Sequence, residues 1–118
     1  MGNILINLWE KVSIYCLNHE EPVEMVIFQN LEKFKTPAYV CSDSGNHCPN
    51  RLNLDDYENI VNKFFEYVDK EGPMMDFTNF SFRHRGARQS IYVKIIKYSH
   101  KEIKIGIFNE TVFGKHYK

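Results

Sequence analysis

The most regular pattern of hydrophobic and polar positions lies in the middle of the chain, between Asn53 and Gly72. Apolar side chains recur there at steps of three and four residues, which puts them on one face of an α-helix. The residues on this face are Leu54, Tyr57, Ile60, Val61, Phe64, Phe65 and Val68. Asn53 or Asp55 can cap the first turn, and Gly72 followed by Pro73 ends a helix. The pattern therefore predicts one long amphipathic helix that begins at residue 54.

A two-residue alternation follows the helix and is typical of β-strands. It runs through residues 80–84, 91–96 and 103–108, with turn formers at 85–88 and 99–101. We expect three strands in an antiparallel meander, with the helix packed over the face that carries the branched apolar side chains. Those side chains are Ile91, Val93, Ile95, Ile103, Ile105 and Ile107.

The first half of the chain alternates as well, in shorter runs. Residues 4–15 predict a short helix followed by a strand. Residues 23–28 predict a second strand, and residues 38–40 form an extended segment that leads into Cys41. The loop 42–47 contains turn formers and almost nothing to bury, so it needs a clamp at its ends to hold a shape.

Composition places the chain among folded globular proteins, and its charge divides it in two. With 118 residues, of which 43% are hydrophobic, it is long enough for one compact core. The formal net charge is zero, but residues 1–72 carry six basic and twelve acidic side chains, whereas residues 73–118 carry nine basic and three acidic ones. An acidic half (net −6) and a basic half (net +6) indicate either a polarised surface that faces an anionic partner or two halves that attract each other.

No stretch approaches the roughly 20 apolar residues that a membrane-spanning helix needs. The opening segment MGNILINLWEKVSIY is apolar, but polar residues interrupt it and no basic region precedes it, so it does not qualify as a signal peptide. We therefore expect a cytoplasmic protein with no membrane partner. In a reducing compartment the three cysteines cannot form a stable set of disulfide bonds, which favours a metal site.

Two pairs of soft or borderline metal ligands lie in the first half of the chain. Cys16 and His19 are separated by two residues, and Cys41 and Cys48 by six. Thiolates and imidazole in two such turns are the ligands of a tetrahedral zinc site, and four protein ligands favour a closed, structural site over a catalytic one. His47 could replace Cys48 as the fourth ligand. The alternative is that the three cysteines are buried or idle and bind no metal.

This ligand arrangement resembles the zinc-ribbon class of folds, in which two knuckles on neighbouring hairpins share one ion. The resemblance covers about residues 13–52, and Cys16, His19, Cys41 and Cys48 match the ligand positions. The chain departs from the family because two glutamates follow His19 and because six residues separate the second pair. Its segments CLNHEEPVEM and CPNRL are similar to small uncharacterised zinc-ribbon proteins of Gram-positive bacteria and their mobile elements.

Together these predictions describe an α+β fold in two parts. Residues 1–53 would form a zinc-ribbon-like β module, and residues 54–118 would form the long helix and the three-stranded meander. We expect the two parts to pack as one compact unit, because each is too small to bury a large core alone.

Basic and aromatic residues gather in the predicted meander. Alternation puts rings and cations on one face of its sheet, namely Tyr92, Lys94, Tyr98, Lys104 and Phe108. Such a face can stack bases and neutralise phosphates, although lysine and aromatic residues also serve β propensity and solubility on strand surfaces. Together with the arginines around the first turn, the residues predicted to bind nucleic acid or another partner are Arg83, Arg85, Arg88, Tyr92, Lys94 and Lys104.

These observations predict a non-enzymatic, zinc-stabilised binding module that contacts nucleic acid, or a protein that handles nucleic acid, through its basic half. The alternative is an inhibitor or adaptor from a phage or mobile element that binds a host protein such as a defence nuclease. A zinc hydrolase is the least favoured reading. His84 could form an acid–base pair with Asp76, but a histidine beside three arginines is more often a surface group, and we expect it to be one here. A homodimer could form through the sheet edges together with three apolar residues near the N-terminus, namely Ile4, Leu8 and Trp9.

Overall fold

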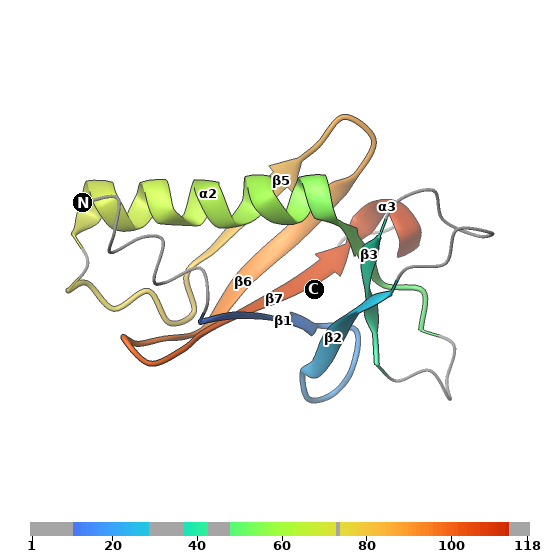
Figure 1. Cartoon of the computed structure of the whole chain (residues 1–118), viewed down its shortest axis with the longest axis horizontal. Coiled ribbons are helices and arrows are strands. Elements are labelled where there is room, and N and C mark those ends of the chain that lie inside the picture. The colour runs from blue at the N-terminus through green and yellow to red at the C-terminus, as the bar shows by residue number, and fades with distance from the viewer. Residues whose placement is uncertain (1–10, 29–36, 43–47, 73, 114–118) are drawn as a thin grey trace.

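A computed structural model describes residues 11–28, 37–42, 48–72 and 74–113, which form one seven-stranded sheet and two helices (Figure 1). The predicted helix near the N-terminus, the residues Ile4, Leu8 and Trp9, and His47 lie outside these ranges. The strands are β1 (Val12–Cys16), β2 (Val23–Phe28), β3 (Ala38–Cys41), β4 (Arg51–Asn53), β5 (Ser81–Arg85), β6 (Ser90–Tyr98) and β7 (Ile103–Asn109). The helices are α2 (Leu54–Glu71) and the short α3 (Glu110–Phe113).

The sheet has the strand order β4-β3-β2-β1-β7-β6-β5, and this order corrects the predicted fold class. β1 pairs with β7 in parallel, from Val12 opposite Ile103 to Cys16 opposite Ile107. The predicted α+β fold, with a zinc-ribbon-like β module followed by one long helix and a three-stranded meander, was therefore wrong, because the strands of both halves belong to one seven-stranded sheet. Alternation in the sequence identifies a strand but not the strand it pairs with. β1 and β7 pair although most of the chain lies between them in the sequence. Neither β4 nor α3 was predicted. The proposed division of the chain at residue 53 stays a prediction.

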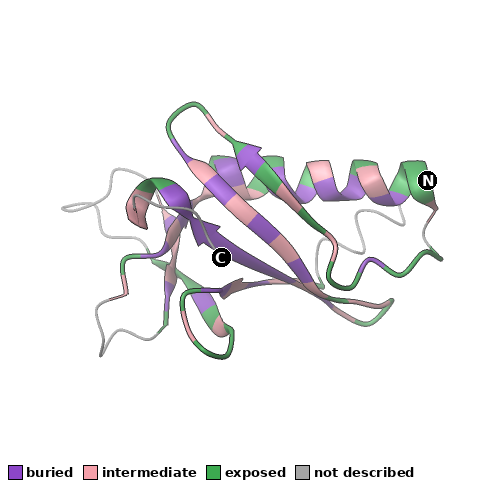
Figure 2. Ribbon diagram, turned by 180° about the vertical axis from the view of Figure 1, so that it is seen from behind, coloured by how far each residue is buried: buried purple, intermediate pink, exposed green. Residues whose placement is uncertain are grey.

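The helix α2 lies along one face of the sheet, as the apolar pattern predicted (Figure 1). Its buried face packs into one core with the isoleucines and valine of β6 and β7, and Figure 2 shows the alternation of buried and less buried residues along β6. The helix ends at Gly72, whose φ of 101° lies in the left-handed region that glycine adopts without strain. Its N–H donates to the carbonyl of Val68 at 2.8 Å. None of the helices among the described residues combines the length and the apolar character needed to cross a membrane.

A buried hydrogen bond between side chains joins the first turn of α2 to β5. His84 Nε2 lies 2.9 Å from Asp56 Oδ1, and the two side chains are 11% and 12% exposed. The expectation that His84 is a surface group was therefore wrong, because its side chain is buried against α2. Asp76 accepts a hydrogen bond from the Thr78 N–H. The hydrogen bond between His84 and Asp56 attaches the helix to the sheet edge.

An irregularity in β6 changes the direction of one predicted surface residue. The register between β6 and β7 shifts between Ile95 and Lys97, as in a β-bulge. Tyr98 consequently lies opposite Ile103 on the helix side, where its ring packs edge-on against Phe64 at 5.8 Å between centroids. Phe108 is also buried, and its ring stacks on that of Phe113. Alternation alone put Tyr98 and Phe108 on the predicted binding face, because it cannot detect a bulge or a covering helix.

Gly106 lies on the face of the sheet opposite α2, where two apolar side chains cover it. A Cβ there would overlap the end of the Leu17 side chain and would approach Ile96 Cδ1 to 3.0 Å. We expect Gly106→Ala to lower the free energy of unfolding by about 1–3 kcal/mol, the usual cost of overpacking. Urea denaturation measures this change, and Ser81→Ala on the exposed part of the same face is the control. Equal stability of the two variants would contradict the prediction.

Candidate metal centre

The four predicted metal ligands come together near the ends of β1 and β3, in the turn after β1 and just before β4. Cys16 ends β1, His19 lies in the turn between β1 and β2, Cys41 ends β3, and Cys48 precedes β4. One ligand atom from each residue lies within 4.8 Å of the others. The antiparallel pairing of β2 with β3 sets Met25 opposite Cys41 and so brings the second ligand pair next to the first. The structure thus contains a Cys3His cluster that can hold a metal ion.

The distances within the cluster agree with a tetrahedral metal site. Cys16 Sγ lies 3.8 Å from Cys48 Sγ, and His19 Nε2 lies 3.2 Å from Cys41 Sγ. Two sulfur atoms that are each about 2.3 Å from a tetrahedral zinc ion are about 3.8 Å apart. None of Cys16, Cys41 and Cys48 forms a disulfide bond, so no such bond competes for these sulfur atoms.

The cluster is partly enclosed by the protein. Cys16 and Cys41 are buried, whereas His19 and Cys48 are half-buried, so an ion can enter from the side of the latter two. Burial raises the pKa of the Cys16 thiol to about 12, although a hydrogen bond from Asn50 opposes part of this rise. Because a metal ligand must be the thiolate, binding of an ion at neutral pH releases the Cys16 proton.

Hydrogen-bond donors surround the Cys16 sulfur. The backbone N–H of Asn18 lies 3.4 Å from it, and the side-chain amide of Asn50 donates to it at 3.0 Å. The sequence does not single out Asn50, because one asparagine two residues after a cysteine forms no recognisable pattern. Its position two residues after the predicted ligand Cys48 is the one signal for a role at the site.

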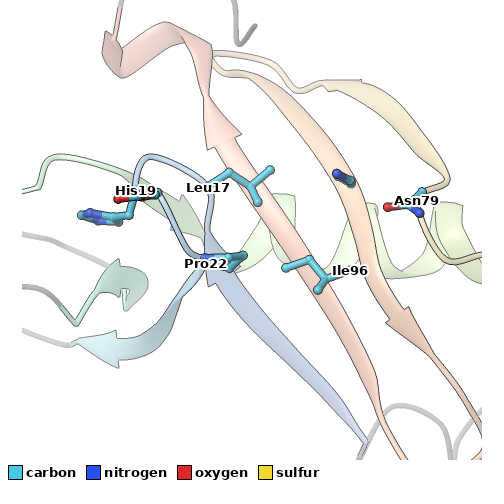
Figure 3. A pocket seen from close by; sticks show the side chains of 7 residues that line it. Leu17, His19, Pro22, Asn79 and Ile96 are labelled. Atoms are coloured by element: carbon cyan, nitrogen blue, oxygen red, sulfur yellow. The ribbon is translucent and has the colours of Figure 1, made fainter.

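A hollow of about 210 Å³ lies beside the cluster, on the sheet face opposite α2. It is lined by Leu17, His19, Glu20, Pro22, Asn79, Lys94 and Ile96. In Figure 3 the His19 ring points away from Leu17, Pro22 and Ile96. His19 thus belongs both to the lining of this hollow and to the Cys3His cluster.

Most of the predicted binding residues lie on the face of the sheet opposite α2, which we call the outer face. The strand registers set Arg83 opposite Tyr92 and Lys94 opposite Gly106 there, with Lys104 two residues before Gly106. The outer face is defined by Tyr15, Arg83, Arg85, Tyr92, Lys94 and Lys104. Arg88 lies apart from it, in the turn between β5 and β6.

Arg83 is held by a neighbouring carboxylate. Its guanidinium donates to both carboxylate oxygens of Glu110, at 2.9 and 3.3 Å. This pairing raises the pKa of Arg83 and fixes its side chain beside the ring of Tyr92, 5.7 Å from the ring centroid. Part of the Arg83 charge is therefore already neutralised within the chain.

Comparison of the chain with protein-family models, with curated proteins and with solved structures finds no match. The resemblance to zinc ribbons stays a prediction from the ligand spacing. The assignment of a metal centre consequently rests on the geometry and chemistry of the four ligands.

Proposed function

We propose that the chain is a non-enzymatic binding module, stabilised by zinc, that contacts nucleic acid through its outer face. The convergence of Cys16, His19, Cys41 and Cys48 within 4.8 Å is the observation that carries the zinc assignment. Thiolate and imidazole donors suit zinc, and three cysteines with one histidine are a common structural set. Four protein ligands complete a tetrahedral site, which leaves no coordination position for a substrate. A structural role therefore fits the donor set better than hydrolysis.

The outer face supports the nucleic-acid part of the proposal. It pairs cations with rings: the Arg83 guanidinium lies over Tyr92 at 5.7 Å, and Lys104 Nζ lies over Tyr15 at 5.4 Å. Because α2 covers the opposite face, these side chains belong to the side of the sheet that the helix leaves uncovered (Figure 1). Bases can stack on such rings while the lysines neutralise phosphates.

Binding to a single-stranded oligonucleotide is expected to be salt-sensitive and to depend on the outer face. Each of Lys94→Ala and Lys104→Ala should weaken binding at low salt and should reduce the slope of log affinity against log salt by about 0.7, the effect of one phosphate contact on a single strand. Fluorescence anisotropy with a labelled oligonucleotide measures both quantities. Lys70→Ala, at an exposed position in the last turn of α2, is the matched control.

The outcome that would overturn the nucleic-acid proposal is also specific. A protein that retains its metal but binds neither single-stranded nor duplex oligonucleotides at low salt does not use this face for nucleic acid. Equal loss of affinity in the Lys70 variant would show that only the total charge matters.

A protein partner is the competing proposal, and one observation favours it. Val26, Ile27 and Phe28 at the end of β2 are 45%, 58% and 41% exposed, which is unusual for three consecutive apolar residues. An adaptor or inhibitor that binds a host protein, or a homodimer, would use such a segment. Recovery of one protein in a nuclease-treated pull-down, together with its loss in Ile27→Asp, would support this alternative over nucleic acid.

A further inference from the structure

Asn50 is a polar residue in a place where a polar side chain is costly. It lies between Cys48 and β4, and it is 1% exposed. A buried amide is tolerated only when its donors and acceptor are satisfied, because each unpaired group costs about 1–3 kcal/mol. The partners of this amide therefore indicate why asparagine occupies the position.

The contacts of Asn50 determine which way its amide points. Its Oδ1 accepts the backbone N–H of Asn109 at 3.0 Å. A backbone N–H can only donate, so the oxygen must lie on that side and the NH2 group must lie on the other. That NH2 group donates to the carbonyl of Ile107 and to Cys16 Sγ, each at 3.0 Å.

Asn50 is in turn held in place by the end of β7. Asn109, itself fully buried, donates from Nδ2 to the Arg51 carbonyl at 2.9 Å and accepts the Val112 N–H at 3.2 Å. Asn50 is thus connected to the start of β4, the end of β7 and the first residues after it. This network leaves the amide little freedom to rotate away from the sulfur.

The hydrogen bond that Asn50 donates to Cys16 Sγ is stronger when the sulfur is a thiolate than when it is a thiol. A neutral thiol is a weak acceptor, whereas hydrogen bonds to ionised groups are about twice as strong as neutral ones. A divalent ion with three thiolates and a neutral imidazole carries a net negative charge, and Cys16 is completely buried. Hydrogen-bond donors aimed at the sulfur offset this buried charge.

We propose that Asn50 is a positioning residue of the metal centre, which donates a hydrogen bond to the Cys16 thiolate and thereby raises the affinity of the site for its ion. The inference rests on the proposed metal site and adds a residue that does not touch the ion. It also explains why an asparagine occupies a buried position that an apolar side chain would fill without the free-energy cost of burying an amide.

Asn50→Asp tests the proposal because the two side chains have nearly the same shape. The aspartate keeps an acceptor for the Asn109 N–H, but it replaces the NH2 that donates to Cys16 and to the Ile107 carbonyl with an oxygen, and it adds a negative charge beside the sulfur. We expect the dissociation constant for zinc, measured by competition with a chromophoric chelator, to rise about 10- to 100-fold, as for other residues that orient metal ligands. The sulfur-to-metal charge-transfer bands of the cobalt-loaded protein should shift as well. Asn59→Asp, on the exposed side of α2, is the matched control.

The possible results separate the two proposals. If the wild-type chain binds no metal, the metal site itself fails. If the wild-type chain binds zinc and Asn50→Asp binds it equally well with an unchanged cobalt spectrum, only the role of Asn50 is overturned. A purely structural role would destabilise the metal-free and metal-loaded proteins equally and would leave the affinity unchanged.

A second measurement uses the wild-type chain and so does not depend on whether the variant folds. In protein loaded with ¹¹³Cd, a hydrogen bond from the Asn50 amide to the Cys16 sulfur should transmit a scalar coupling between the amide proton and the metal nucleus. Absence of this coupling, with the same Asn50 side-chain resonances in the metal-free and loaded states, would overturn the proposal.

Discussion

Replacement of Cys41 by serine is expected to abolish stoichiometric metal binding and to open the part of the sheet formed by β2, β3 and β4. Cys41 is buried, and its sulfur lies 3.2 Å from His19 Nε2. The four ligands join the end of β1 and the following turn to the end of β3 and the start of β4. In zinc-finger peptides the binding of structural zinc supplies an apparent free energy of about 10–16 kcal/mol, so loss of one ligand removes a large share of what holds these strands.

Elemental mass spectrometry and amide hydrogen exchange measure the two parts of this prediction. We expect about one zinc per wild-type chain and none in Cys41→Ser. Exchange should become faster in β2 and β3 while β6 and β7 stay protected, because those strands share the core with α2. Ser42→Ala, at the exposed next residue, is the control. Wild-type protein that contains no metal, together with unchanged exchange in the variant, would show that the cluster is not a metal site.

Phe64→Ala is expected to lower the free energy of unfolding by about 3–5 kcal/mol, the usual cost of truncating a buried phenylalanine. Phe64 is fully buried on the sheet-facing side of α2. Its ring contacts Phe77 edge-on at 5.4 Å and Tyr98 at 5.8 Å between centroids. The truncation therefore removes contacts to the segment before β5 and to β6 at once, and those contacts hold the helix on the sheet.

Urea denaturation of metal-loaded protein measures this loss. Glu66→Ala, two residues further along the same helix and exposed, should change the free energy of unfolding by less than about 0.5 kcal/mol. A loss below about 1 kcal/mol in Phe64→Ala would mean that the core closes around the missing ring. Unchanged zinc content in Phe64→Ala would distinguish this defect from the one caused by Cys41→Ser.

The effects expected for Phe64→Ala and Cys41→Ser reflect two sources of stability, the apolar core and the proposed metal site. The helix and the strands β5, β6 and β7 bury a continuous apolar core. The strands β2, β3 and β4 carry fewer buried side chains, and β2 exposes three apolar residues at its end. A small β region with little core of its own is where a metal contributes most to stability.

The amino-acid sequence by itself determined the helix, most of the strands and the four residues that could hold a metal ion. The residues from Leu54 to Val68 repeat with the period of a helix, and residues such as Ile103 and Ile105 alternate as in a strand, because both periods arise from local backbone geometry. The cysteines and the histidine could be recognised as candidate metal ligands, because thiolates and imidazole at that spacing are typical of zinc sites. These features need no knowledge of distant contacts.

Only the tertiary structure decided which strands pair, which side chains change face and which buried amide contacts Cys16. The parallel pairing of β1 with β7, the bulge that turns Tyr98 toward the helix, and the contact of Asn50 with Cys16 all join residues that are far apart in the chain. Each depends on the packing of the whole core, since a strand has two edges and a buried amide has several partners to choose from. Local sequence patterns specify what an element is, whereas the burial of one shared core specifies where it lies.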